Sequence, residues 1–422
     1  MNSLVYIVNL ILVGSFAFAM WRKSSRSLRK FFWTALLSKL IAGISLGLIY
    51  AYYYNGNDTF SFFNDAKTLA NVCRINVYEY IQFLWSGDQN SALSIKLYYV
   101  EPRSLFFVKE LSLISLITSN NYWISSLWLS LLSFSGCWYL FIRLTDFFTH
   151  MKWPAALSLF FFPSFVFWGS GVIKESSAAA ALCFIIGVFL LVINKQKPSL
   201  VELIITILSL FVLWNLKYYW AAILIPTLIT SLIFVYVIER NFTFKNKALE
   251  TGIWLIVFLT LSVGVSFVHP NFYFDRLLFV IVENHDLFVK ISAPESTIHF
   301  HQLQPEWYSM LINAPWALIS GLFRPFVFES TNVVQIIAGV ENVFLFIFFI
   351  ISMKRLKLIG HSPSRLIIYS AIVYISLLCI FLALSTPNFG TLSRYRIGFL
   401  PVLCLLIFYE NPLLNKFTFL RK

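Results

Sequence analysis

Charged residues are scarce in this chain, and that scarcity is the first constraint on its class. Only 12% of the 422 residues are charged, 59% are hydrophobic, and the mean hydropathy is +0.77. A soluble globular protein carries about 25% charged residues, so this composition excludes a cytosolic enzyme and a disordered chain. Five cysteines in such a length exclude a small disulfide scaffold.

Acidic residues are the scarcer of the two charge types. The chain has 19 Asp and Glu against 32 Lys and Arg, which gives a net charge of +13. In a soluble protein this balance would suggest nucleic acid as a partner. In an apolar chain it first indicates how the loops are placed across a bilayer, so we expect no nucleic-acid partner.

Long apolar runs are abundant, and each is long enough to be considered as a membrane span. They predict an all-α, polytopic transmembrane protein in which residues 1–422 form a single integral membrane domain. Two shorter apolar stretches, 105–118 and 309–323, are expected to be interfacial or re-entrant helices on the outer face. The expected spans number about 11 and cover residues 3–20, 31–54, 121–144, 153–169, 176–194, 199–215, 219–238, 249–267, 331–352, 366–385 and 399–412.

Basic residues gather in alternate loops, and short loops rich in Lys and Arg remain in the cytoplasm. This pattern predicts an N-terminus outside, a cytoplasmic C-terminus, and two large outer loops at about 55–120 and 268–330. The basic loop residues are Arg22, Lys23, Arg26, Arg29, Lys30, Arg143, Lys152, Lys195, Lys197, Arg240, Lys245, Lys247, Lys354, Arg355, Lys357, Arg365, Lys416, Arg421 and Lys422.

Two carboxylates stand in the first outer loop, directly after the second expected span. Asp58 and Asp65 are seven residues apart, so on a helix they share one face. A carboxylate at the membrane surface could act as a general base toward an acceptor hydroxyl. The structural alternative is that Asp58 caps a helix and that Asp65 is a solvated helix residue.

A lysine and a glutamate follow a glycine-rich turn between two expected spans. Gly169 and Gly171 allow a tight turn, and Lys174 and Glu175 then lie at the outer membrane boundary. Ionisable residues at such a position are candidates for function. Lys174 could bind a lipid phosphate, with Glu175 as a supporting residue, or it could simply reach the headgroups or pair locally with Glu175.

Arginines on the outer face run against the preference for cytoplasmic basic residues. Arg394 and Arg396 open the last span, with Tyr395 between them as a supporting residue, and Arg324 stands five residues before Glu329. A guanidinium binds phosphate bidentately, so the three arginines are candidate contacts for a phosphate-linked lipid. Salt bridges to outer acidic residues, with Glu329 as a supporting residue for Arg324, are the structural alternative.

Several familiar chemical signatures are missing from the sequence. His299 and His301 have no carboxylate or cysteine at ligand spacing, so we expect no metal site. There is no glycine-rich nucleotide loop, no serine nucleophile elbow and no HExxH motif. The donor of any group transfer is therefore not expected to be a cytoplasmic nucleotide sugar. No cofactor is predicted, and a divalent metal is left open.

This layout resembles the polytopic membrane glycosyltransferases of the GT-C type, which use lipid-linked sugars. The segment Asp-Thr-Phe-Ser-Phe-Phe-Asn-Asp-Ala-Lys is similar to their acidic first outer loop, 105–118 to an interfacial helix, and Lys174 with Arg-Tyr-Arg to phosphate-binding side chains. The run Phe-Pro-Ser-Phe-Val-Phe-Trp-Gly-Ser-Gly-Val-Ile-Lys-Glu also resembles membrane proteins of bacterial envelope-polysaccharide synthesis. Two departures are the position of the acidic loop after the second span and the missing soluble C-terminal domain.

The resemblance implies an enzyme of the bacterial inner, or plasma, membrane. It would transfer a sugar from a polyprenyl-phosphate donor to a glycolipid or glycan acceptor on the extracytoplasmic face. Asp58 would be the general base, while Lys174, Arg394 and Arg396 would bind the donor phosphate.

Three other functions compete with this one. A polysaccharide polymerase or ligase acting on lipid-linked repeats would yield a ladder of products. A transporter or flippase predicts inverted repeats and helices broken near the bilayer midplane. A non-catalytic scaffold would leave the outer cations unexplained.

Overall fold

Helices form nearly all of the regular structure. The computed structural model describes residues 2–54, 58–86, 96–238, 247–353 and 364–416, and within these ranges it contains no β-strand. The predicted all-α class is therefore confirmed. Seven basic loop residues that were assigned to the cytoplasm lie outside these ranges: Arg240, Lys245, Lys354, Arg355, Lys357, Arg421 and Lys422. The α-helices are α1 (Asn2–Lys23), α2 (Arg26–Tyr52), α3 (Asp58–Ile75), α4 (Val77–Ser86), α5 (Pro102–Ile117), α6 (Tyr122–Phe147), α7 (Lys152–Ala156), α8 (Pro163–Trp168), α9 (Lys174–Ile193), α10 (Leu200–Ile233), α12 (Lys247–Ser266), α13 (Phe274–Ile291), α14 (Trp307–Phe323), α15 (Val333–Met353), α16 (Ser364–Ser385), α17 (Phe389–Tyr395), α18 (Leu400–Phe408) and α19 (Pro412–Lys416).

Eight helices among the described residues are long and apolar enough to cross a membrane, or nine if one bent pair forms a single span. The protein is thus an integral membrane protein, but the predicted 11 spans are too many. α5 and α14, which cover the predicted 105–118 and 309–323 helices, are helical and are not among the eight. The expected orientation across the bilayer stays a prediction.

The predicted span 153–169 is wrong because its helix is interrupted. The segment consists of α7, a π-helical turn over Leu157–Phe161 and the six-residue α8. Pro163 has no backbone N–H and restricts the residue before it to extended geometry. Phe162 has φ −79° and ψ 113°, which ends the first piece before α8 begins. No piece reaches the length of a bilayer crossing.

Two other predicted boundaries differ from the structure. The windows 199–215 and 219–238 form one candidate span, Leu200–Ile238, although two helices meet at non-helical Lys217, within the predicted gap. The window 399–412 contains only the nine-residue α18, which is bent by 69° from the preceding Phe389–Gly398. Composition found both apolar regions, while the backbone conformation at a few residues decided how many helices they form.

The described chain divides into two compact units. The first comprises Met1–Asp146, Leu159–Val188 and Pro198–Tyr218, and the second comprises Phe147–Ser158, Phe189–Lys197 and Tyr219–Lys422. The expectation of a single membrane domain stays a prediction. Each unit is described by itself below.

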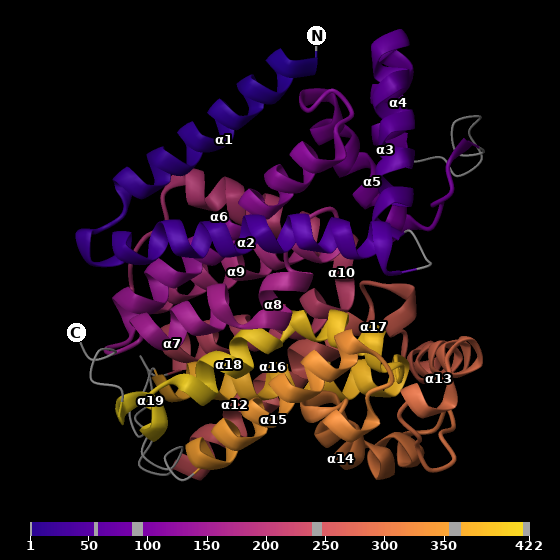
Figure 1. The fold of residues 1–422 in the computed structure, drawn as a ribbon. Helices are drawn as coiled ribbons and strands as arrows, with labels where there is room; N and C mark the ends of the chain where they lie inside the picture. Colours follow the sequence, from indigo (N-terminus) through magenta and orange to yellow (C-terminus); the bar gives the residue numbers. More distant parts are fainter. Residues whose placement is uncertain (1, 55–57, 87–95, 239–246, 354–363, 417–422) are drawn as a thin grey trace. The chain divides into compact units, whose positions relative to one another are not determined.

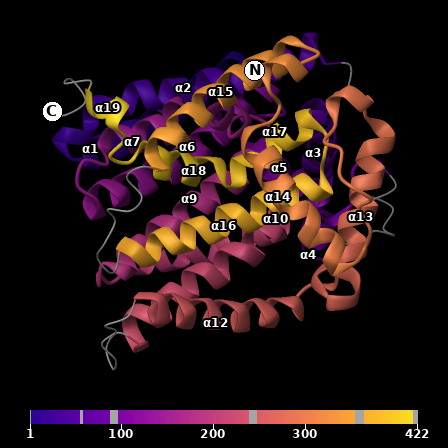
Figure 2. The same ribbon diagram turned by 90° about the horizontal axis from the view of Figure 1, so that it is seen from below.

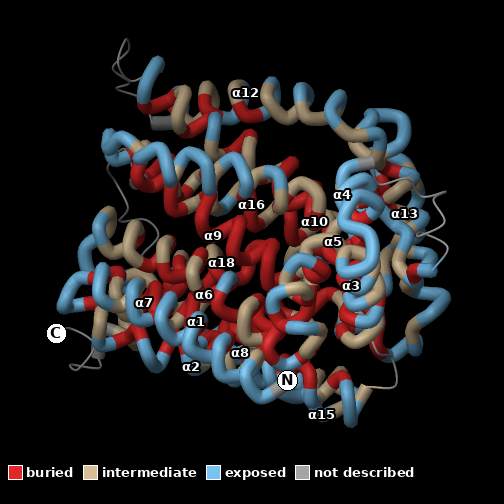
Figure 3. Tube along the Cα trace, turned by 90° about the horizontal axis from the view of Figure 1, so that it is seen from above, coloured by how far each residue is buried: buried red, intermediate tan, exposed pale blue. Residues whose placement is uncertain are grey.

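The first unit is built around two long N-terminal helices and the buried part of α9. α1 and α2 follow one another after a short turn, and α3 packs against α4 and α5 (Figure 1). An aromatic core joins α2 and α6, where the ring of Phe32 lies 5.1 Å from that of Phe134 and 4.8 Å from that of Trp138. In the apolar window of α9, 89% of the residues are buried, against 17% in that of α1 (Figure 3). The exposed apolar face of α1 is suited to lipid.

The second unit contains α12 to α18. α12 and α16 run side by side (Figures 2 and 3), and buried Glu250 of α12 forms an ion pair with Arg365 of α16. α16 also packs against α13, α14 and α18. Close packing of α14 on α16 depends on Gly321, where a Cβ atom would lie 2.5 Å from the Cys379 sulfur.

Candidate functional site

The two predicted carboxylates both lie on α3, but in different environments. Asp58 is the first residue of the helix and is exposed, a position where a negative charge is favoured by the helix dipole. Asp65 is buried, and its two carboxylate oxygens accept backbone N–H bonds from Tyr98 at 3.1 Å and Tyr99 at 2.8 Å. Asp65 therefore fastens residues 98–99 to α3, while Asp58 faces solvent.

Burial and hydrogen bonding act on Asp65 in opposite directions. Burial raises the pKa of the Asp65 carboxyl above its usual value, and the two backbone hydrogen bonds lower the pKa by a smaller amount. In this structure the Asp65 carboxylate holds the backbone amides of Tyr98 and Tyr99 in place. Its predicted catalytic role would require it to leave both of these partners.

Lys174 begins α9 and is held against α3 and α5. Its ammonium lies 5.0 Å from the centre of the Phe62 ring and donates a hydrogen bond to the Ser104 hydroxyl at 3.2 Å. The ring of Phe62 is itself fixed by stacking on Tyr99 at 3.9 Å. Asp58 and Phe62 are one helical turn apart, about 6 Å along the axis of α3. Lys174 therefore packs on a side chain of α3 that lies one helical turn after Asp58.

Glu175, the residue beside Lys174, binds a lysine that sequence reasoning missed. Its carboxylate lies 2.6 Å from the ammonium of Lys217, and both side chains are buried. Lys217 stands at the kink of α10, with φ −144° and ψ 60°. The signal was present in the sequence, since Lys217 interrupts a long apolar run. The ion pair that the structure shows for Glu175 is this long-range one with Lys217.

A third cation lies in the same part of the first unit and was also missed. Arg103 precedes Ser104, and its exposed guanidinium lies 5.5 Å from the centre of the Tyr218 ring, next to Lys217. We refer to Arg103, Lys174 and Lys217 as the cationic cluster. Glu175 pairs with Lys217, and Arg103 and Lys174 are the two other cations of this cluster.

In the second unit, Arg324 forms a two-bond ion pair with Glu329. Its Nε donates to Glu329 at 3.1 Å, and its Nη2 donates to the other carboxylate oxygen. The guanidinium also lies 4.8 Å from the centre of the Phe389 ring. The structural alternative given above, a salt bridge to Glu329, describes this contact. A phosphate would have to compete with that carboxylate.

Arg396 is completely buried and connects three segments. Its guanidinium donates to the carbonyl oxygens of Leu322 at 3.4 Å and Arg324 at 3.1 Å, and to the side chain of Asn342 at 2.8 Å. The Glu341 carboxylate also acts on it electrostatically. These contacts tie the end of α17 to α14 and α15. The predicted phosphate contact of Arg396 would require it to exchange these partners.

Arg394 and Tyr395 lie half-buried in the last turn of α17. The helix begins after Asn388, whose side chain caps it by accepting the backbone N–H of Thr391 at 2.9 Å. The predicted site residues thus divide between the units. Asp58, Asp65, Lys174 and Glu175 belong to the first, and the remaining five, Arg324, Glu329, Arg394, Tyr395 and Arg396, to the second.

Neither a group of metal ligands among the described residues nor a similar known protein points to a function for this chain. Within the described parts of the chain, no three His, Cys, Asp or Glu side chains are grouped as metal ligands. No family model, no curated protein and no solved structure matches this chain. The resemblance to GT-C enzymes therefore remains a prediction that rests on the quoted residues.

Proposed function

We propose that this protein is a membrane glycosyltransferase that moves a sugar from a polyprenyl-phosphate donor to a glycolipid or glycan acceptor on the extracytoplasmic face. The observation that supports it best is the placement of Lys174 at the first turn of an apolar helix, while Glu175 is bound to Lys217. The ammonium of Lys174 at the start of α9, whose neighbour Glu175 binds Lys217, is suited to bind the phosphate of a lipid.

The donor phosphate is proposed to bind Lys174 and Arg103. Lys174 is oriented by Ser104 and Phe62, and Arg103 by the Tyr218 ring. Orienting partners reduce the side-chain entropy lost when a ligand binds. This arrangement lies entirely within the first unit. Roles for Arg324, Arg394 and Arg396 stay predictions from the sequence.

The proposed reaction uses Asp58 as a general base. The acceptor hydroxyl oxygen attacks the anomeric carbon of the donor sugar, and its proton passes to the Asp58 carboxylate. The bond between that carbon and the phosphate oxygen breaks, and polyprenyl phosphate leaves with the electron pair. Lys174 and Arg103 stabilise the negative charge that develops on the departing phosphate.

Binding of the donor lipid is tested first, with undecaprenyl phosphate alone as the probe and the purified full chain in detergent. Lys174→Gln is expected to weaken binding about tenfold, because it removes one charge-assisted hydrogen bond. Lys67→Gln is the matched control, since Lys67 is exposed on α3. Equal binding by wild type and Lys174→Gln would remove the phosphate assignment.

Transfer is tested separately, with polyprenyl-phosphate hexoses as donors and lipid extracts as the source of acceptors. Asp58→Asn should bind undecaprenyl phosphate as wild type does, yet lose at least about 100-fold in transfer rate. Full activity in Asp58→Asn contradicts the base assignment. A ladder of products in place of a single addition would make the protein a polymerase or ligase.

Transport is the second candidate, and one observation favours it. α10 is kinked at a charged residue within an apolar segment of 39 residues, Leu200–Ile238, and broken helices are typical of transporter sites. Flux of a lipid-linked sugar across proteoliposome membranes distinguishes the two functions. Flux that survives in Asp58→Asn, without any transferred sugar, would support transport over transfer.

A further inference from the structure

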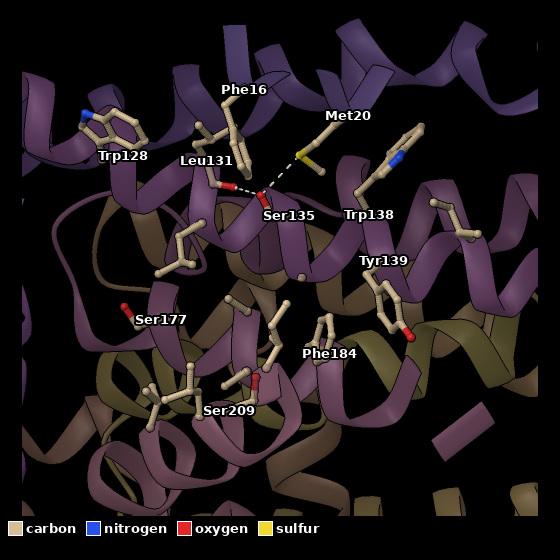
Figure 4. Close-up of a pocket in the computed structure, with 18 of the residues that line it drawn as sticks. Phe16, Met20, Trp128, Leu131, Ser135, Trp138, Tyr139, Ser177, Phe184 and Ser209 are labelled. Carbon is tan, nitrogen blue, oxygen red and sulfur yellow. Dashed lines mark hydrogen bonds between the residues drawn. The ribbon is translucent and has the colours of Figure 1, made fainter. Parts of the chain in front are cut away.

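A cavity of about 620 Å³ lies within the first unit, among α1, α5, α6, α9 and α10. This volume is in the range that binds small molecules. Its wall is mainly apolar, and Figure 4 shows the aromatic side chains of Phe16, Trp128, Trp138, Tyr139 and Phe184 around it. The predicted site residues do not line it, so the proposed transfer reaction does not account for the cavity.

Most polar groups in the wall already have protein partners. The Ser135 hydroxyl donates to the Leu131 carbonyl at 2.7 Å, and the indole N–H of Trp138 donates to Ser24 at 3.0 Å. The Tyr139 hydroxyl donates to Glu202 at 2.6 Å. Lys23, which is exposed at the end of α1, also lines the cavity.

The carboxyl group of Glu110 is different. One oxygen accepts a hydrogen bond from the Ser177 hydroxyl at 2.6 Å. The other, Oε2, is buried and has no hydrogen-bond partner among the described residues. Burial also raises the pKa of Glu110 to about 7, against a smaller lowering by Ser177. An unpaired carboxyl oxygen in an apolar cavity is costly unless a ligand supplies its partner.

Glu110 lines the cavity from α5, and the other lining residues indicate how far the cavity extends along its helices. Ser177, Ala181 and Phe184 are spaced by four and three residues, so they form one stripe along α9. Trp128 and Ile142 line the cavity from α6 and are 14 residues apart, which is roughly 21 Å along a helix. The cavity is therefore long enough to hold an extended chain and not only a compact molecule.

We propose that this cavity binds an amphipathic molecule that has an apolar chain and a hydroxyl group, such as a long-chain alcohol. The hydroxyl group hydrogen-bonds Glu110 Oε2, and the chain lies along the stripe of Ser177, Ala181 and Phe184. A hydroxyl fits because it can donate to an ionised carboxyl and accept from a protonated one. A plain hydrocarbon chain would leave Oε2 unpaired, so the site prefers the alcohol.

This site is tested by binding alone, without any sugar donor, so its failure is separate from failure of the proposed transferase. The probe is hexadecan-1-ol with a photoactivatable diazirine in its chain, added to the purified full chain in nanodiscs. Cross-links are expected in the peptides of α1, α6, α9 and α10. Excess unlabelled hexadecan-1-ol should displace the probe at a concentration about tenfold lower than hexadecane does.

Two variants and one control separate the hydrogen bond from the apolar wall. Glu110→Leu should abolish the preference for the alcohol over the alkane, and Glu110→Gln should retain part of it because an amide both donates and accepts. Ala181→Phe should reduce labelling by filling the cavity. Glu79→Leu, at an exposed carboxylate on α4, should leave the preference unchanged.

Three results would overturn the proposal. The first is equal displacement by hexadecane and hexadecan-1-ol in the wild-type protein. The second is an unchanged preference in Glu110→Leu when its elution volume and thermal melting match those of the wild type. The third is displacement by tetraphenylphosphonium at a lower concentration than by hexadecan-1-ol, which would identify a site for organic cations.

Discussion

Buried charged side chains are bound differently at the beginning of α9 in the first unit and at the turn after α17 in the second unit. At α9, Lys217 binds the carboxylate of Glu175, and Glu110 accepts a hydrogen bond from the Ser177 hydroxyl. At the turn, the single guanidinium of Arg396 donates to three oxygens from α14, α15 and the residue after α14. A group with several partners connects the fold. The carboxyl of Glu110 has one oxygen without a hydrogen-bond partner among the described residues, and that oxygen is available to the proposed ligand.

The largest expected effect comes from breaking the ion pair at α9. Lys217→Met leaves the buried Glu175 carboxylate without its counter-ion, which costs about 3–5 kcal/mol in unfolding free energy. Chemical unfolding in detergent micelles measures it. The double variant Glu175→Gln/Lys217→Met should recover most of that loss, because no unpaired charge then remains. An equal loss in the single and double variants would show that the ion pair is not the cause.

The next effect is a pH dependence of stability that Glu110 produces. Its folded-state pKa of about 7 lies above the ordinary value of 4.5, so protonated Glu110 favours the folded state. The contribution is complete below about pH 4.5 and is lost as the pH rises through 7, by about 3 kcal/mol in all. Unfolding free energies of the wild type and Glu110→Gln across this range test it. Parallel curves would contradict the prediction.

A smaller loss is expected at the turn after α17. Arg396→Gln removes most donors from three oxygens, and we expect a decrease of about 2 kcal/mol in unfolding free energy. Arg394→Gln, at the half-buried neighbouring arginine, is the matched control and should cost less. If both variants lose the same amount, the turn does not depend on Arg396 in particular.

The smallest stability effect is expected at Arg103, where the side chain is exposed. Arg103→Gln should change the unfolding free energy by no more than about 0.5 kcal/mol. It should nevertheless weaken binding of undecaprenyl phosphate about fivefold, since it removes a positive charge from the cationic cluster. Stability and lipid binding measured on one preparation separate the two effects. Unchanged binding would restrict the proposed phosphate site to Lys174.

The apolar helices were predictable from sequence because each needs only its own run of residues. α9 and α15 fall within two residues of the windows 176–194 and 331–352 at both ends. The window 153–169 was wrong because total hydropathy does not register the break at Pro163. The gap predicted between the windows 199–215 and 219–238 coincides with the kink at Lys217, where the backbone is non-helical and two helices meet.

Side-chain partners were less predictable than helices. The sequence identified Lys174 and Glu175 as neighbours, but the carboxylate of Glu175 binds Lys217, which is 42 residues away. The spacing of Asp58 and Asp65 does not distinguish the two carboxylates. In the structure, the carboxylate of Asp65 binds the backbone amides of residues 98–99. Neither Arg103 nor Glu110 was predicted as a site residue, because no local sequence pattern distinguishes them.

The sequence by itself determined that the protein is helical and membrane-embedded. The few charges and long apolar runs indicate a chain embedded in lipid. In lipid, helices are favoured because they satisfy their own backbone hydrogen-bonding groups. Only the tertiary structure decided that Glu175 pairs with Lys217 and that Ser177 binds one oxygen of Glu110 while the other oxygen has no partner among the described residues. Those contacts join helices distant in sequence, so they depend on how the helices pack and not on any local pattern.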